Sequence, residues 1–279
     1  MNDFYVTLPS NAGMDVYPDN AISHFTTRLR KSLDLSKEWE VALVEATVPT
    51  RWENVNKDEW IRLQTPVYKN TDTSDKPVEY GKRWLKAHIS PDFYETTDLL
   101  VNSLNKVIHI LFEKSQKLRY NIDTYSLPFK EYLKYDRKTN IVSYNSPSQL
   151  QTTSNLALLL GYGSDSQKKW VTIPKGVNTR MADLTRGWTN IFVYTDIVEY
   201  QIVGDTLAPL LRVIPMKNYT TIGRIDHYTH VFNNPHYVPI GRHFIETIHV
   251  DLMSDTGEYV PFLIGKSIIK LHFRKKSRI

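Results

Sequence analysis

The tripeptide Asp255-Thr256-Gly257 is the same as the one that carries the catalytic aspartate of aspartic proteases. Such an enzyme needs two carboxylates that share a proton, supplied by two lobes or by a dimer. It also needs a second motif further along the chain, in which two apolar residues precede Gly-Arg-Asp. The nearest string is Pro239-Ile240-Gly241-Arg242-His243, which comes before the tripeptide and ends in a histidine. We therefore predict a turn between two strands, with Gly257 at positive φ, and keep an aspartic protease as a remote alternative.

The histidines raise the question of a metal site. His227 and His230 form a His-x-x-His pair, Asp226 precedes them, and His236 and His243 follow. Structural zinc sites usually include cysteine thiolates, and this chain has no cysteine. A His-Glu-x-x-His helix is also missing from the sequence. We interpret these histidines as scattered and expect no bound metal.

Other catalytic and cofactor motifs are missing from the sequence as well. There is no phosphate-binding loop, and Gly161-Tyr162-Gly163 lacks the strand-turn-helix context of a dinucleotide fingerprint. There is no Gly-x-Ser-x-Gly elbow and no thiol nucleophile. Paired carboxylates for glycoside hydrolysis cannot be recognised from sequence, although acidic residues are sparse in the apolar runs. We expect a protein that is not an enzyme and that needs no cofactor.

The composition is that of a globular protein with a sizeable core. The chain has 279 residues, of which 41% are hydrophobic and 23% charged, and it includes 17 tyrosines. Without cysteine no disulfide can form, so we expect synthesis in a reducing compartment, the cytoplasm or the nucleus. No signal peptide is visible and the apolar runs are too short to span a bilayer, so we expect no membrane insertion.

Much of the mild net charge of +5 lies close to the C-terminus. Four basic residues there read as a solvated tail that could contact a polyanion. They are Arg274, Lys275, Lys276 and Arg278.

The two ends of the chain read as β-strands. In the first part we expect strands at 4–8, 22–29 and 39–48. In the last of these, Trp39, Val41 and Leu43 fall on one face of the strand. In the C-terminal part, from about 188, we expect an irregular stretch at 227–239 and strands at 191–194, 198–203, 210–214, 247–252 and 269–273.

The middle of the chain has an α+β character. Residues 52–86 are polar, with a linker-like stretch at 69–77. Apolar residues at helical spacing predict a helix over 97–114, capped by Thr96 or Thr97. A hairpin over 132–144 and a short helix over 155–160, ending at Gly161, are also expected.

This order suggests one β domain interrupted by an insertion, because neither β segment is long enough for a stable sandwich alone. The expected parts are 1–51, 52–186 and 187–279.

Tryptophans gather around the insertion and its borders, at Trp52, Trp60, Trp84, Trp170 and Trp188. Such residues are enriched at protein interfaces and on sugar-binding platforms, although packing in a core is their commoner fate. We regard Trp52, Trp60 and Trp188 as candidate interface residues.

Four stretches of the sequence carry a resemblance to a known family. These stretches are 4–11 with 17–20, 39–45, 193–213, and 255–262 with 271–274. In them the chain resembles the minor capsid (penton) protein of Polinton, or Maverick, elements and of their adintovirus and virophage relatives. The four stretches span almost the whole chain.

The resemblance implies a mainly β protein, a single jelly-roll β-sandwich interrupted by an α+β insertion domain. It implies homopentamers at the five-fold vertices of an icosahedral capsid, in contact with a double-jelly-roll major capsid protein. The protein would then reside in the virion, with the basic tail against packaged DNA and the insertion available to a host receptor. A receptor- or glycan-binding β-sandwich module is the alternative.

Overall fold

The chain forms two compact units in a computed structural model, Met1–Trp52 with Trp188–Ile279 as unit 1, and Glu53–Gly187 as unit 2. The borders expected from the sequence, at 52 and 187, lie one residue away from these. The structure describes residues 3–35, 38–69, 78–120, 128–163, 169–185, 189–216 and 227–276.

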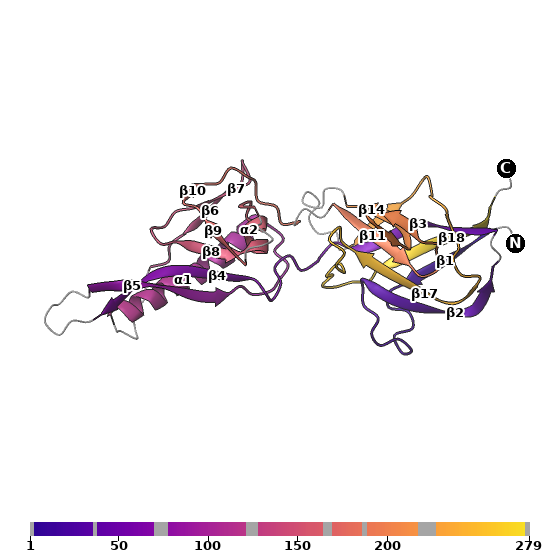
Figure 1. The fold of residues 1–279 in the computed structure, drawn as a ribbon, viewed down its shortest axis with the longest axis horizontal. Coiled ribbons are helices and arrows are strands. Elements are labelled where there is room, and N and C mark those ends of the chain that lie inside the picture. Colours follow the sequence, from indigo (N-terminus) through magenta and orange to yellow (C-terminus); the bar gives the residue numbers. More distant parts are fainter. Residues whose placement is uncertain are drawn as a thin grey trace. The chain divides into compact units, whose positions relative to one another are not determined.

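Unit 1 is a sandwich of two antiparallel sheets (Figure 1). The first sheet contains, in spatial order, β1 (Asp3–Pro9), β18 (Ile268–Lys275), β3 (Trp39–Pro49) and β15 (His227–Val231), and β16 (Val238–Pro239) also pairs with β3. The second sheet contains β14 (Leu210–Pro215), β11 (Asn190–Thr195), β17 (Phe244–Met253) and β2 (His24–Asp34).

The order of these strands is that of a jelly roll. If the eight main strands are counted along the chain, the first sheet reads 1-8-3-6 and the second 5-4-7-2. Each sheet therefore combines strands from both ends of the chain, as two Greek keys wound together require. The jelly roll implied by the resemblance is confirmed by this strand order.

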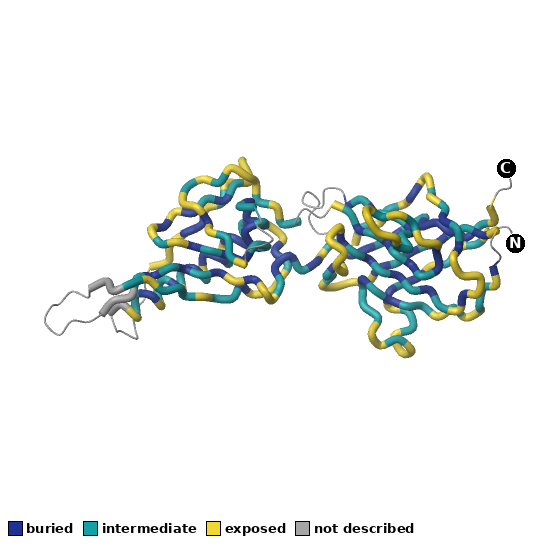
Figure 2. Tube along the Cα trace, in the orientation of Figure 1, coloured by how far each residue is buried: buried dark blue, intermediate teal, exposed yellow. Residues whose placement is uncertain are grey.

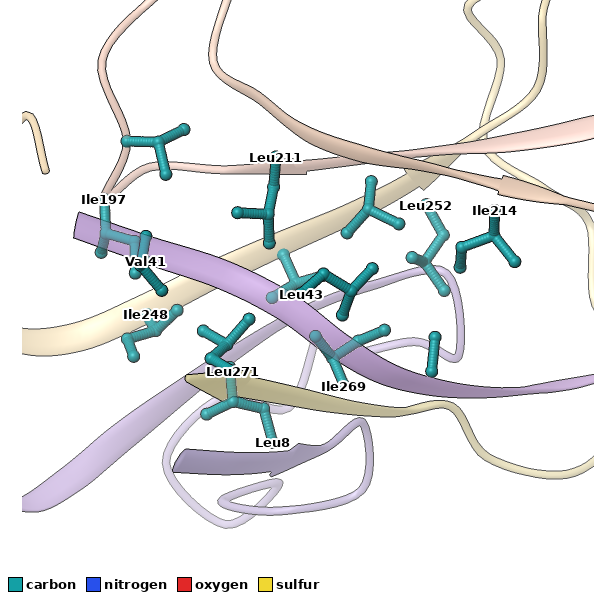
Figure 3. Packing of buried hydrophobic residues seen from close by; sticks show 14 of the residues in the cluster. Leu8, Val41, Leu43, Ile197, Leu211, Ile214, Ile248, Leu252, Ile269 and Leu271 are labelled. Carbon is teal, nitrogen blue, oxygen red and sulfur yellow. The ribbon is translucent and has the colours of Figure 1, made fainter. Parts of the chain in front are cut away.

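Alternating apolar residues fill the space between the two sheets (Figure 3). Val41, Leu43 and Leu271 of the first sheet meet Ile248 and Leu252 of the second, and all five are fully buried. Figure 2 shows the same alternation as changes of colour along the strands. Burial of each such side chain contributes about 1.5–3 kcal/mol.

In the first half of β3, the face that points into the core is the predicted one, because Trp39, Val41 and Leu43 are all buried. A β-bulge then shifts the register between β3 and β18, so that Ala46 and Val48 point inward further along.

Trp52 and Lys276 lie at opposite ends of the sandwich, as one backbone contact at each end shows. At one end Trp52, the last residue of unit 1 before the insertion, bridges to Phe262. At the other end the backbone amide of Lys276 donates to the carbonyl of Glu38 at 2.6 Å. Within unit 1, Trp52 therefore lies at the opposite end of the sandwich from Lys276.

The described part of unit 2 contains a four-stranded antiparallel sheet, two helices and a small three-stranded sheet. The larger sheet has the order β5 (Val78–His88), β4 (Trp60–Lys69), β8 (Leu150–Thr153) and β9 (Trp170–Ile173). The helices are α1 (Thr97–Tyr120) and α2 (Ser154–Leu159), and the small sheet has the order β10 (Gly176–Val177), β7 (Ile141–Tyr144) and β6 (Leu133–Asp136).

The core of unit 2 lies between α1 and one face of the larger sheet. Ile61 and Leu63 of β4 pack in the same fully buried cluster as Leu100, Leu104 and Ile108 of α1. These positions on α1 follow the helical spacing expected from the sequence.

The predicted helices and hairpin of the middle part are confirmed. The amide of Leu99 donates to the Thr96 hydroxyl at 3.3 Å, so Thr96 caps α1, which runs on to Tyr120. The hairpin is formed by β6 and β7. The short helix α2 ends two residues before Gly161, whose φ is +83°.

Two strands were not predicted, and two sequence-based predictions were wrong. The polar stretch 52–86 contains β4 and β5, whose outward face mixes polar, basic and aromatic side chains and so hides the strand pattern. The stretch 227–239, predicted to be irregular, contains β15 and β16, which pair with β3. The strand predicted at 198–203 begins only at Gln201. Most of the linker-like stretch 69–77 lies outside the described residues.

Candidate interaction surfaces

The Asp255-Thr256-Gly257 tripeptide forms a turn, as predicted. Gly257 has a φ of +78°, and the amide of Ser254 donates to the carbonyl of Glu258 at 2.8 Å. The side chain of Asp255 is exposed at this turn. The geometry is that of a tight connection in which glycine takes the left-handed conformation.

The His-x-x-His pair lies in a strand, which sends its two imidazoles to opposite faces. His227 and His230 are both in β15, and residues three apart in a strand cannot share a ligand. The His230 ring lies 3.0 Å from the Tyr228 hydroxyl. In the described part of the chain, no group of three or more His, Asp or Glu side chains is placed to hold a metal ion.

The basic C-terminal residues differ in their surroundings. Arg274 lies within β18, where its Nε donates to Glu40 at 2.6 Å and its guanidinium carbon sits 3.3 Å from the centre of the Tyr237 ring. The prediction of a solvated tail is therefore wrong for Arg274. Lys275 and Lys276 are exposed, and Arg278 lies outside the described residues.

The three candidate interface tryptophans also differ. Trp52 is only 6% exposed and belongs to the core of the jelly roll. Trp60 is 38% exposed at the start of β4, in unit 2, where it meets His88 edge-on. Trp188 lies outside the described residues. Trp52 and Trp60 thus belong to different units, and Trp60 is the one with an accessible surface.

The hairpin of β12 (Gln201–Val203) and β13 (Thr206–Ala208) forms an apolar surface on unit 1 that the sequence analysis did not single out. Ile202 and Leu207 are direct partners across the hairpin, so their side chains share one face. They are 82% and 63% exposed. Alternation on both sides of the Gly204-Asp205 turn is the signal that could have identified this hairpin.

A second surface missed by sequence reasoning lies on the outer face of the β5-β4-β8-β9 sheet. The guanidinium carbon of Arg62 is 4.6 Å from the centre of the Trp84 ring and 4.2 Å from that of Trp170. The Arg62 Nε donates to Gln151 Oε1 at 2.7 Å. Because these residues come from four different strands, no local pattern in the sequence could have brought them together.

A polar cluster occupies the outer face of the second jelly-roll sheet. His249 lies 2.8 Å from the Thr26 hydroxyl through Nδ1 and 3.0 Å from Asp251 Oδ1 through Nε2. Its backbone amide donates to Asp196, which also pairs with Arg242. The hydrogen bond to Asp251 raises the pKa of His249 above its ordinary value of 6.5, against the opposing effect of partial burial.

Together these features define a single jelly-roll β-sandwich with an α+β unit inserted between its third and fourth strands. Neither helix in the described part of the chain is long and apolar enough to cross a membrane.

Two solved structures are similar to this chain over nearly its full length. One is the crystal structure of the mavirus penton protein, with 10% identity, a TM-score of 0.45, and coverage of 98% of this chain and 99% of that one. The other is a chain of the Sputnik virophage structure determined by cryo-EM, with 10% identity, a TM-score of 0.47, and coverage of 99% and 98%. No family model matches the chain, and no curated protein sequence does either. The assignment of the jelly roll rests on the strand order and not on this likeness.

Proposed function

We propose that this chain is a structural capsid protein, a minor capsid (penton) protein of the kind found in Polinton elements, adintoviruses and virophages. Five copies of the chain would form a ring through their jelly rolls at each five-fold vertex of an icosahedral capsid, within the virion. The observation that carries the proposal is the complete eight-strand jelly roll with a single large insertion, because this sandwich is a common capsid architecture. The four stretches of sequence resemblance add to it.

A ring of five requires heterologous contacts, in which one surface of each copy meets a different surface of the next. We propose that the hairpin of β12 and β13 supplies one of these surfaces, because Ile202 and Leu207 expose apolar area on one face. Each Å² of apolar area buried there contributes about 25 cal/mol. Part of that attraction is offset by the entropy lost on association, so shape complementarity matters more than area.

The two ends of the jelly roll suit different neighbours. The insertion joins one end, and Lys275 and Lys276 lie at the other. We therefore propose that the insertion is available to a host receptor and that the basic terminus faces packaged DNA. Arg274 contributes less, because its charge is already paired with Glu40. The sides of the sandwich would contact the double-jelly-roll major capsid protein.

We also propose that the two units are autonomous domains. Each has its own cluster of buried apolar side chains, so each can fold around its own core. Residues 53–187 expressed alone should unfold cooperatively. A non-cooperative transition of this fragment would contradict the proposal.

Native mass spectrometry of the full chain tests the assembly. We expect a particle of five times the 32.5 kDa mass of one chain. Replacement of both Ile202 and Leu207 by Asp should leave a folded monomer, because two charges would then enter an apolar contact. The matched control replaces Val177 and Met181 in unit 2, which are 78% and 66% exposed, by Asp and should leave the ring intact. A wild-type chain that stays monomeric, even when it is co-expressed with the major capsid protein, would refute the proposal.

Binding to duplex DNA at several salt concentrations tests the basic terminus. Each phosphate contact contributes about 0.9 to the slope of log K against log salt. Replacement of Lys275, Lys276 and Arg278 by Ser should weaken binding and flatten this slope. Unchanged binding would show that the terminus does not contact DNA.

A further inference from the structure

The outer face of the β5-β4-β8-β9 sheet in unit 2 combines aromatic and basic side chains in one small area. We call it the tryptophan face, and it consists of Trp60, Arg62, Trp84, Lys86, Gln151 and Trp170. Trp60 and Arg62 lie on the same side of β4, opposite His88 and Lys86 of β5, and Trp84 shares the side of Lys86 two positions away. Gln151 of β8 is opposite Arg62. Trp170 of β9 is opposite Thr153, which shares a side of β8 with Gln151.

The opposite face of the same sheet is the buried one. Ile61 and Leu63 alternate with the residues of the tryptophan face along β4 and pack against α1. The structure therefore assigns the hydrophobic core to one side of the sheet and leaves three indoles for the other. Among the described residues Trp60 is the most accessible of the three, at 38%. A sheet face with this much aromatic surface is typical of a binding site.

Arg62 is the fixed centre of the tryptophan face. Its guanidinium lies between the Trp84 and Trp170 rings, at 4.6 and 4.2 Å from their centres. Gln151 accepts a hydrogen bond from its Nε at 2.7 Å and in turn donates to Thr172 at 2.8 Å. The stack and this chain of hydrogen bonds hold the guanidinium in one orientation, so little entropy is lost when its terminal nitrogens bind a ligand.

Two positive charges are neighbours at the centre of this face. Lys86 is the register partner of Arg62 and lies 5.9 Å from the Trp170 ring centre. Lys82 occupies the same side of β5 as Lys86. Among the described residues, neither Arg62 nor Lys86 forms an ion pair. Adjacent unpaired cations are complementary to an anion.

From these observations we propose that the tryptophan face binds an acidic glycan. The terminal nitrogens of Arg62 would take a carboxylate or sulfate in a bidentate manner, and Lys86 would add a second charge to the same group. The accessible indole of Trp60 would pack against the C–H face of a sugar ring, since tryptophan offers a large rigid apolar surface.

The size of the face favours a short glycan over a nucleic acid strand. Four strands spaced about 4.8 Å apart make a surface roughly 14 Å wide, which is enough for two or three sugar rings. Single-stranded nucleic acids are usually held by a basic groove that follows many phosphates, together with aromatic rings that are free to stack on bases. Here the cations are concentrated around Arg62, which itself occupies one face of both Trp84 and Trp170. This proposal concerns unit 2 alone and does not depend on the assembly of the jelly roll.

The test uses the full chain and three immobilised probes: 3′-sialyllactose, a heparin-derived tetrasaccharide and neutral lactose. We expect binding to at least one acidic probe that is tenfold or more tighter than binding to lactose. Arg62→Gln should reduce that binding by tenfold or more, because a charge-assisted bidentate contact is lost. Lys86→Gln, at an exposed position, should also weaken it without affecting the fold. Arg137→Gln is the matched control, since Arg137 is an exposed arginine of unit 2 on the β6–β7 connection that pairs with Asp98.

Three results would overturn the proposal. They are the absence of binding to both acidic probes, equal binding by the wild type and by both Arg62→Gln and Lys86→Gln, and tighter binding of a dT12 oligonucleotide that depends on Arg62. Thermal unfolding of each variant shows whether a loss of binding reflects a loss of fold. If Arg62→Gln unfolds, Lys86→Gln alone decides the outcome.

Discussion

A single buried amide in unit 2 offers the sharpest test of how helix α1 is tied to the small sheet. Asn105 is 1% exposed, and its Oδ1 accepts hydrogen bonds from the backbone amides of Tyr132 at 2.9 Å and Leu133 at 2.8 Å. Its Nδ2 donates to the carbonyl of Leu133 at 2.8 Å. Three backbone groups at the start of β6 thus depend on one side chain.

Asn105→Ala removes all three hydrogen bonds at once. Each bond contributes about 0.5–1.5 kcal/mol net, and a buried polar group left without a partner costs about 1–3 kcal/mol. Allowing for water entering the space, we expect the free energy of unfolding of unit 2 to fall by roughly 3 kcal/mol, with a range of about 2–5. Asn105→Asp should also destabilise, because the Nδ2 donor is lost and a charge is buried.

The assay is urea unfolding of the full chain followed by tryptophan fluorescence, combined with hydrogen exchange. The amide of Leu133 should exchange much faster in Asn105→Ala than in the wild type, because its acceptor has gone. Asn102→Ala is the matched control, since Asn102 is exposed on the same helix, and we expect its effect to stay within about 0.5 kcal/mol. If Asn105→Ala lowers the stability by less than about 1 kcal/mol, the side chain does not hold β6 to α1 as we argue.

Three further perturbations test other parts of the structure. Because Asp251 raises the pKa of His249 above 6.5, this pair stabilises the fold fully below pH 6.5 and loses its effect as the pH rises through the folded-state value. Asp251→Asn should therefore destabilise more at pH 5.5 than at pH 8.5 in urea unfolding, and a penalty that does not change with pH would contradict this reasoning. Gly161→Ala should lower the melting temperature more than Gly176→Ala, since both have positive φ but only at Gly161 would a Cβ lie within 2.5–2.8 Å of backbone atoms; equal shifts would be evidence against the clash. Leu271→Ala, in the fully buried centre of the jelly roll, should cost about 2–5 kcal/mol in denaturant unfolding, and a loss below about 1 kcal/mol would mean that the two sheets pack less closely than they do here.

Local periodicity predicted the elements whose two faces differ strongly. Helix α1 was recognisable because Leu100, Leu104 and Ile108 recur on one side, and β3 because Trp39 and Val41 alternate with other residues. Strands β4 and β15 were missed for a physical reason. Their outward or edge positions carry polar and aromatic side chains, so the sequence lacks the simple contrast between apolar and polar residues.

The candidate surfaces, too, could be predicted from the sequence only in part. The sequence marked Trp52 and Trp60 as candidate interface residues, but it did not show that Trp60 is 38% exposed whereas Trp52 is buried. The basic residues near the C-terminus were visible, whereas the pairing of Arg274 with Glu40 was not, because these residues lie 234 positions apart. Nothing in the local pattern around Arg62 pointed to its stack with two indoles.

By itself, the sequence determined that this is a β-rich protein interrupted by an α+β insertion, since hydrophobic periodicity and turn residues act over a few positions. Only the tertiary structure decided which strands pair, and hence that the two ends of the chain interleave in the order of a jelly roll. It also decided which cations gain a carboxylate partner and which are left facing solvent beside aromatic rings. The reason is that hydrogen bonding between strands and packing between sheets depend on distance in space, and the residues that meet there are separated by most of the chain.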